Sequence, residues 1–163
     1  MNELKKSVLK LLQEEARYTA KEIAVMLGKT ENEIKDVVKD LEDSGVIVKY
    51  TAVVNTEKTG EDCVDALIEV KVTPQAMSGF DSIAEEIYRF DEVKAVYLMS
   101  GTYDLAITLE SKTMRDVSLF VSERLAPIDA VVGTATHFIM KKYKEGGVVL
   151  DDGEQVNRLL IHE

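Results

Sequence analysis

The chain has 163 residues, 45% of them apolar and 31% charged, so it can form one large globular domain or two small ones and is not a disordered or fibrous chain. Twenty Lys and Arg against thirty Asp and Glu give a net charge of −10, which argues against binding DNA or acidic membranes through bulk charge, so an anionic partner has to meet a local patch. No apolar run is long enough to cross a bilayer, the first residues lack the order of a secretion signal, and Cys63 is the single cysteine. We therefore expect a cytoplasmic protein with no disulfide framework and no cysteine metal cluster, in which Cys63 is a small buried side chain.

Residues 1–45 carry apolar side chains at helical spacing and predict three short helices. The apolar positions form three groups: Leu4, Val8, Leu11 and Leu12; Ile23, Ala24 and Leu27; Ile34, Val37, Val38 and Leu41. The spacing Thr-x-x-Glu, which predicts a capping box at the start of a helix, occurs twice: at Thr19 with Glu22 and at Thr30 with Glu33.

The connection between the second and third predicted helices is short. We expect Gly28 and Gly45 to end helices, because glycine adopts a left-handed cap at little cost. Only Lys29 and Thr30 then separate the two helices, so they must cross sharply. This is the geometry of a helix-turn-helix.

Beyond Gly45 the apolar period changes from helical to alternating. Strands are predicted from Val46 to Asn55 and from Val64 to Val72. The later predictions, in chain order, are a helix over 80–90, a strand from Val93 to Met99, a turn at 100–102, a strand from Tyr103 to Leu109, a helix from Thr113 that ends before Pro127, and a strand from about Val131 to Tyr143. The order βαββαβ predicts a ferredoxin-like antiparallel sheet with both helices on one face. The expected fold class is α+β, an N-terminal winged helix-turn-helix followed by this sheet domain.

The sequence also indicates where the domains meet. The polar stretch 56–61 contains Gly60 and is the expected linker between a helix-turn-helix domain at 1–55 and a sheet domain at 62–144, with a tail at 145–163. The sheet face that the helices leave open carries several apolar side chains, and such faces rarely stay exposed to water. We therefore expect the chain to self-associate.

The sequence resembles the Lrp/AsnC ("feast or famine") family of transcriptional regulators. The residues that carry the resemblance are 11–19, 22–24, Leu27, Gly28, Ile34, 41–47 and 50–55 in the first half, and 101–104, Thr134 and Thr136 in the second. The resemblance covers roughly residues 3–143. It implies an oligomeric DNA-binding regulator whose second domain senses a small amino-acid-like effector in a pocket between subunits.

The predicted third helix is the candidate DNA reader. In a helix-turn-helix this helix enters the major groove, where side chains near its start contact base edges and nearby cations hold phosphates. The candidate contacts are Lys29, Thr30, Asn32, Lys35 and Lys39, with Arg17 and Thr19 placed for the DNA backbone just before the second helix. An alternative for the lysines is a solvated helix face with i,i+4 pairs such as Glu31 with Lys35.

The same helix also carries six acidic residues, and this sequence departs there from the family, which commonly shows arginines around Asp36, Val37 and Asp40. Residues 1–60 hold ten basic and eleven acidic side chains, a net charge of −1 that leaves −9 for the rest of the chain. The acidic load therefore lies mainly away from the candidate reader. Few useful lysines mean weak binding by one copy, so the mechanism needs several readers held together.

The turn Gly101-Thr102-Tyr103-Asp104 and the pair Thr134 and Thr136 are the candidate effector residues. Gly101 fits a hairpin turn that needs a residue tolerant of positive φ. Asp104, next to Tyr103, would pair with an ammonium group, and the two threonines, which point to the same side of a strand, would donate to a carboxylate. An acid for the ammonium and donors for the carboxylate suit a free amino acid. The alternative is that the threonines are ordinary strand formers and Asp104 a solvated turn residue.

The predicted function is a DNA-binding transcriptional regulator without catalytic activity, cofactor or bound metal. Its two histidines, His137 and His162, lie far apart and have no metal-ligand spacing, and no nucleophile motif is present. One alternative is an effector-sensing co-regulator of the same architecture that does not bind DNA by itself. A second is an enzyme, because tetrapyrrole decarboxylases have a similar two-half layout that would give His137 a catalytic role.

Overall fold

The computed structural model describes residues 1–73 and 79–150. The chain divides into two compact units, Met1–Val53 and Val54–Glu163, and each is described by itself. Within the described ranges, no helix is both long and apolar enough to span a membrane.

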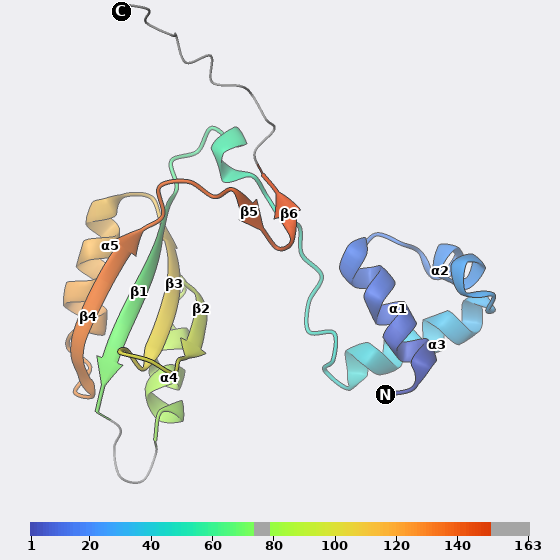
Figure 1. The fold of residues 1–163 in the computed structure, drawn as a ribbon, viewed down its shortest axis with the longest axis horizontal. Helices are drawn as coiled ribbons and strands as arrows, with labels where there is room; N and C mark the ends of the chain where they lie inside the picture. The colour runs from blue at the N-terminus through green and yellow to red at the C-terminus, as the bar shows by residue number, and fades with distance from the viewer. Residues whose placement is uncertain (74–78, 151–163) are drawn as a thin grey trace, which may run out of the picture. The chain divides into compact units, whose positions relative to one another are not determined.

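The N-terminal unit consists of three helices, α1 (Glu3–Glu14), α2 (Ala20–Leu27) and α3 (Glu31–Asp43), as predicted (Figure 1). Their apolar faces meet in one core, made of Val8, Leu12, Ile23, Ala24, Ile34 and Leu41. Because every helix contributes to this core, its burial fixes the crossing of α3 over the other two helices.

The predicted helix ends are confirmed. Thr19 and Thr30 each form a complete capping box, in which the threonine hydroxyl accepts from the backbone N–H of the glutamate three residues on and the glutamate carboxylate accepts from the threonine N–H. Gly28 ends α2 with a φ of +62°, a left-handed conformation that costs glycine little. The turn between α2 and α3 is therefore determined by the residues of the turn itself.

The strand predicted from Val46 to Asn55 is wrong. The described segment contains no strand, and Val48 is 88% exposed. Alternating apolar residues do not make a strand without a partner that accepts and donates the backbone hydrogen bonds, and the described residues supply no such partner for this segment.

The C-terminal unit is an antiparallel four-stranded sheet covered on one face by two helices, which confirms the predicted arrangement (Figure 1). The strands lie in the order β2-β3-β1-β4. Their bounds and those of the helices are β1 (Val64–Val72), α4 (Asp81–Tyr88), β2 (Val93–Leu98), β3 (Leu105–Ser111), α5 (Met114–Phe120) and β4 (Val131–Phe138). The core lies between the sheet and the helices and includes Ile68, Val70, Ile107, Ile87 and Val117.

Several boundaries differ from the prediction. β3 begins at Leu105, two residues late, and β4 ends at Phe138, five residues before the predicted Tyr143. The helix that α5 begins continues in a π-helical turn over Val121–Leu125 and ends before Pro127, as expected for a residue that cannot continue a helix. Cys63 is only partly buried rather than buried.

Two short elements were not predicted. A 3-10 turn covers Thr56–Lys58 within the expected linker, and the strands β5 (Lys144–Glu145) and β6 (Val148–Val149) form a hairpin. The hairpin turns at Gly146 and Gly147, with φ of 52° and 85°, the conformation that a tight two-residue hairpin turn requires. The Asn55 side chain donates a hydrogen bond of 3.1 Å to the carbonyl of Leu150, which ties the hairpin to the start of the unit.

Candidate functional site

The outward face of α3 is the candidate DNA-binding surface. Opposite the buried Ile34 and Leu41, four exposed residues repeat at spacings of four, three and four along the helix: Asn32, Asp36, Lys39 and Asp43. We refer to these four residues as the outward stripe. The predicted contacts Asn32 and Lys39 both lie on the stripe, and Lys35 flanks it.

Most acidic residues of α3 have partners within the unit. Glu31 pairs with Lys35 at 2.6 Å, Asp40 pairs with Lys5 of α1, and Glu42 accepts a hydrogen bond of 2.9 Å from the Tyr50 hydroxyl. Glu33 is held by the Thr30 cap, whose backbone N–H lowers the pKa of the Glu33 carboxyl. These carboxylates therefore stabilise the helix and its packing.

Several predicted DNA contacts also have intramolecular partners. The Glu15 carboxylate lies 3.1 Å from the Arg17 guanidinium, the predicted pair of Glu31 with Lys35 is present, and the Thr19 and Thr30 hydroxyls form helix caps. By contrast, no side-chain hydrogen bond or ion pair occupies Lys29, Asn32 or Lys39 in the described part of the chain. Of the cations predicted to contact DNA, Lys29 and Lys39 are therefore the two that can bind without first giving up an intramolecular partner.

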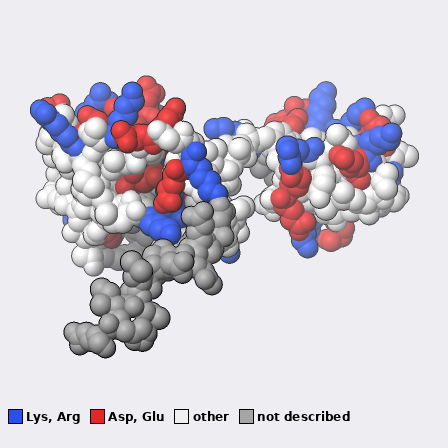
Figure 2. All heavy atoms as spheres, turned by 90° about the horizontal axis from the view of Figure 1, so that it is seen from above, with Lys and Arg blue, Asp and Glu red and all other residues white. Residues whose placement is uncertain are grey.

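Basic and acidic side chains are intermixed on this unit. Figure 2 shows them interspersed on the face of the lobe without grey residues, with no single basic patch on the side in view. An anionic partner therefore has to be met by particular side chains and by exposed backbone N–H groups rather than by a broad positive field.

In the second unit, Asp104 has a defined set of partners. Its carboxylate accepts hydrogen bonds of 3.0 Å from the Lys71 ammonium and 3.0 Å from the backbone N–H of Val72. The Val72 N–H, and then the Lys71 ammonium, lower the pKa of Asp104. Sequence reasoning expected an ammonium at this carboxylate but missed that the chain provides one, from the polar side of the alternating strand β1.

The turn before Asp104 differs in one respect from the prediction. Gly101 is exposed and is not among the glycines with positive φ, so the expected left-handed turn residue is wrong. A Cβ at Gly101 would meet no atom within 4 Å, so packing within the chain does not require a glycine there either.

Thr134 and Thr136 point to the same side of β4, as predicted. They pair with Val70 and Ile68 of β1, whose buried side chains face the helices, so both threonines lie on the helix-covered face at the edge of the sheet. Lys71, the partner of Asp104, lies on the opposite face. The described chain therefore does not bring the threonine hydroxyls and the Asp104 carboxylate onto one face of the sheet.

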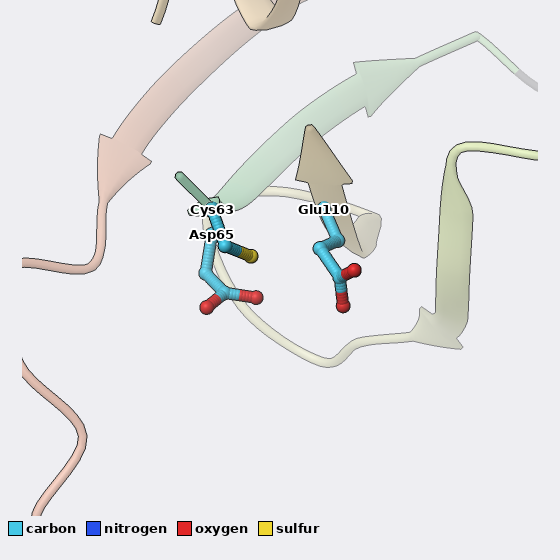
Figure 3. Close-up of side chains that lie close together, drawn as sticks. All are labelled: Cys63, Asp65 and Glu110. Atoms are coloured by element: carbon cyan, nitrogen blue, oxygen red, sulfur yellow. The ribbon is translucent and has the colours of Figure 1, made fainter. Parts of the chain in front are cut away.

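A separate cluster lies at the other end of β1. The Cys63 thiol and the carboxylates of Asp65 and Glu110 lie within 4.8 Å of one another (Figure 3). The Lys142 ammonium is 2.8 Å from Asp65, so a cation already neutralises this carboxylate. Burial, followed by the nearby Asp65 charge, raises the pKa of the Cys63 thiol, which disfavours the thiolate that metals bind.

Two family models match the chain. Residues 65–149 match the Lrp/AsnC ligand binding domain, and residues 1–48 match a winged helix-turn-helix DNA-binding domain. The two matches fall on the two units that the structure separates.

Similar proteins match over most of their length. An uncharacterized HTH-type transcriptional regulator of Bacillus subtilis, YugG, is 44% identical over 99% of this chain and 98% of its own. The HTH-type transcriptional regulator FL11 of Pyrococcus furiosus is 30% identical over 89% of this chain and 93% of its own.

Solved structures share the fold. The crystal structure of PH0061 matches with a TM-score of 0.76 and 25% identity, over 89% of this chain and 96% of that one. The transcriptional regulator NMB0573 of Neisseria meningitidis, solved in complex with L-Met, matches with a TM-score of 0.72 and 23% identity, over 89% of this chain and 93% of that one. With the ligand-binding model spanning more than half of its residues, and a relative that is 44% identical nearly end to end, the chain belongs to the Lrp/AsnC family of helix-turn-helix transcriptional regulators.

Proposed function

We propose that this regulator binds double-stranded DNA as a homo-oligomer through α3, and that a small amino-acid-like effector bound by the C-terminal unit changes its DNA affinity or its state of assembly. The observation that carries the proposal is the union, in one chain, of a capped helix-turn-helix that has free side chains on its outward stripe with a unit that matches a ligand-binding domain. Ligand binding in one unit changes DNA binding in the other when the two equilibria are coupled.

Self-association is part of the proposal because one reader is weak. Each phosphate neutralised contributes a slope of about 0.9 to the salt dependence of binding, and one copy of α3 offers few free cations. Copies tied together raise the effective concentration of each reader at neighbouring half-sites. Two surfaces support association. One is the segment with the exposed Val46, Val48, Val53 and Val54, and the other is the open sheet face, where Tyr97 is exposed and Leu67 is half-buried among charged residues.

The effector pocket is proposed to lie between copies. Asp104 would hold the ammonium of the effector, and Thr134 and Thr136 its carboxylate, with Gly101 and Tyr103 in the turn beside them. Because the Asp104 carboxylate and the threonine hydroxyls of one chain lie on opposite faces of its sheet, a pocket that uses both favours contributions from more than one copy. The ammonium of the effector would replace the Lys71 ammonium as the partner of the Asp104 carboxylate.

The test is a titration of the full chain against labelled duplex DNA from upstream of its own coding region, at about 50 mM and about 200 mM salt. We expect affinity to fall steeply with salt. Lys39→Ala should weaken binding by about 1 kcal/mol or more and lower the salt slope, because it removes a phosphate or base contact. Lys112→Ala removes an exposed lysine of the other unit and is the matched control. The twenty amino acids are then added one at a time, L-methionine among them, and one should shift the curve.

A second candidate function is a co-regulator that senses the effector but does not bind DNA alone. The pairs of Arg17 with Glu15 and Lys35 with Glu31, which neutralise two predicted contacts, favour it. Absent or salt-insensitive binding, together with an amino acid that raises the melting temperature, would support this candidate over the first.

A further inference from the structure

The six acidic residues of α3 fall into two groups. Four have structural partners: Glu31 with Lys35, Glu33 in the cap, Asp40 with Lys5 and Glu42 with Tyr50. For Asp36 and Asp43, the structure gives no hydrogen bond or ion pair within the described residues. Their carboxylates are therefore not explained by the stability of the unit.

The two unpaired carboxylates lie at different positions along the outward stripe. Asp36 lies in the second turn of α3, one turn after Asn32 and one turn before Lys39. Asp43 is the last residue of the helix. In a helix-turn-helix, residues in the first turns of the reading helix contact base edges, so Asp36 is placed to do so and Asp43 is not.

A carboxylate at this position faces a polyanion and weakens binding unless it accepts a hydrogen bond from the DNA. An ionised carboxylate is only an acceptor. The major groove presents two kinds of donor, the N4 amino group of cytosine and the N6 amino group of adenine, and adenine places the N7 acceptor next to its donor, which repels a carboxylate. Cytosine is the base that a carboxylate pairs with best.

We propose that Asp36 is a specificity-determining residue that accepts a hydrogen bond from the N4 amino group of a cytosine in the major groove. The inference rests on the proposed function, namely that α3 enters the groove of duplex DNA. Lys39 lies one turn after Asp36 on the outward stripe, and a lysine ammonium donates to the O6 and N7 atoms of guanine. Asp36 and Lys39 together therefore suit a G·C pair, with the carboxylate bound to the cytosine and the ammonium to the guanine.

The test is selection from a random pool of duplex DNA by the full chain, followed by sequencing of the bound molecules. The wild type is compared with Asp36→Asn, Asp36→Ala and the control Asp43→Asn, which removes the other unpaired carboxylate of the stripe. Both positions are exposed, and circular dichroism verifies that each of the three variants retains its helices.

We expect the wild type to select a motif in which one position of each half-site is cytosine. Asp36→Asn should change that position to adenine, because an asparagine amide pairs with adenine N6 and N7, and Asp36→Ala should reduce discrimination there by roughly fivefold or more. Asp43→Asn should select the wild-type motif.

Two results would overturn the inference. If Asp36→Asn and Asp36→Ala tighten binding to all sequences equally and leave every position of the motif unchanged, Asp36 only repels DNA. If the wild type selects no motif under any condition, the proposed function itself fails and the inference with it. The two failures are distinct, because the first yields a motif and the second does not.

Discussion

Asp104 shows how one side chain can be both a structural group and a candidate ligand. Its carboxylate joins the end of β1 to the turn before β3, through the Val72 N–H and the Lys71 ammonium, and its own N–H donates to the Val70 carbonyl. These contacts favour the ionised form. An effector that pairs with Asp104 therefore competes with a contact that the fold already makes.

The lowered pKa of Asp104 predicts a pH-dependent stability. Ionised Asp104 stabilises the folded chain above the unfolded pKa of an aspartate, about 3.9, and this contribution is lost as the pH falls through the lower folded pKa. Asp104→Asn should therefore melt below the wild type near neutral pH, and the two curves should converge as the pH falls from about 5 towards 2. Thermal unfolding at several pH values measures this. Asp91→Asn, at an exposed residue of the same unit, is the control, and a constant difference at all pH values would contradict the assignment.

At the scale of elements, the capping boxes determine where α2 and α3 begin. In each, one threonine hydroxyl and one glutamate carboxylate satisfy backbone N–H groups that have no partner within the helix. Thr30, a predicted DNA contact, is thus first a residue that positions the start of the candidate reader.

Thr30→Ala should destabilise the N-terminal unit by about 1 kcal/mol, because it leaves the first turn of α3 without its cap. Thr30→Ser keeps the hydroxyl and should remain close to the wild type. Thermal unfolding followed by the helical circular dichroism signal distinguishes the two, with Thr19→Ala as a parallel case at α2. Equal stability of Thr30→Ala and the wild type would show that the box contributes little.

The helices could be predicted because their signals are local, whereas a strand also needs a partner strand that local sequence does not reveal. Capping boxes, glycine stops and apolar spacing all lie within a few residues, so the three helices of the first unit follow from the sequence. The segment 46–55 has the same quality of local signal as β1, yet only β1 has neighbouring strands to pair with. The hairpin of β5 and β6 was missed because strands of two residues carry no period to detect.

The candidate sites were predictable as residue types but not as contacts. Family resemblance and the helix-turn-helix order indicated α3 and the turn at 101–104. Partners such as Lys71 for Asp104, or Lys5 for Asp40, depend on elements far apart in sequence, and no local pattern gives them. Local sequence therefore located α3 as the candidate reader. Only the fold distinguished Asp36, which has no partner within the described residues, from the acidic residues whose contacts stabilise the helix.

For the whole molecule, the open sheet face predicts self-association. Sedimentation at micromolar concentration should show dimers or larger assemblies. Leu67→Asp places a further carboxylate between Asp65 and Glu69 on the face that also carries Glu110, and it should dissociate the assemblies through like-charge repulsion. Leu119→Asp, at an exposed position of α5, is the control. A wild type that sediments as single chains would contradict both the association and the DNA-binding mechanism that requires it.

The hairpin of β5 and β6 ties the last described residues to the segment that follows the N-terminal unit. Lys142 anchors it to Asp65, and the Leu150 carbonyl anchors it to Asn55, two residues beyond the boundary of the first unit. A cut at the exposed Gly146-Gly147 tip would leave Leu150, the partner of Asn55, attached among the described residues only through the short β5–β6 pairing and its hydrogen bond to Tyr143. Proteolysis at the tip is therefore expected to free the Asn55 side chain while both hydrophobic cores stay folded.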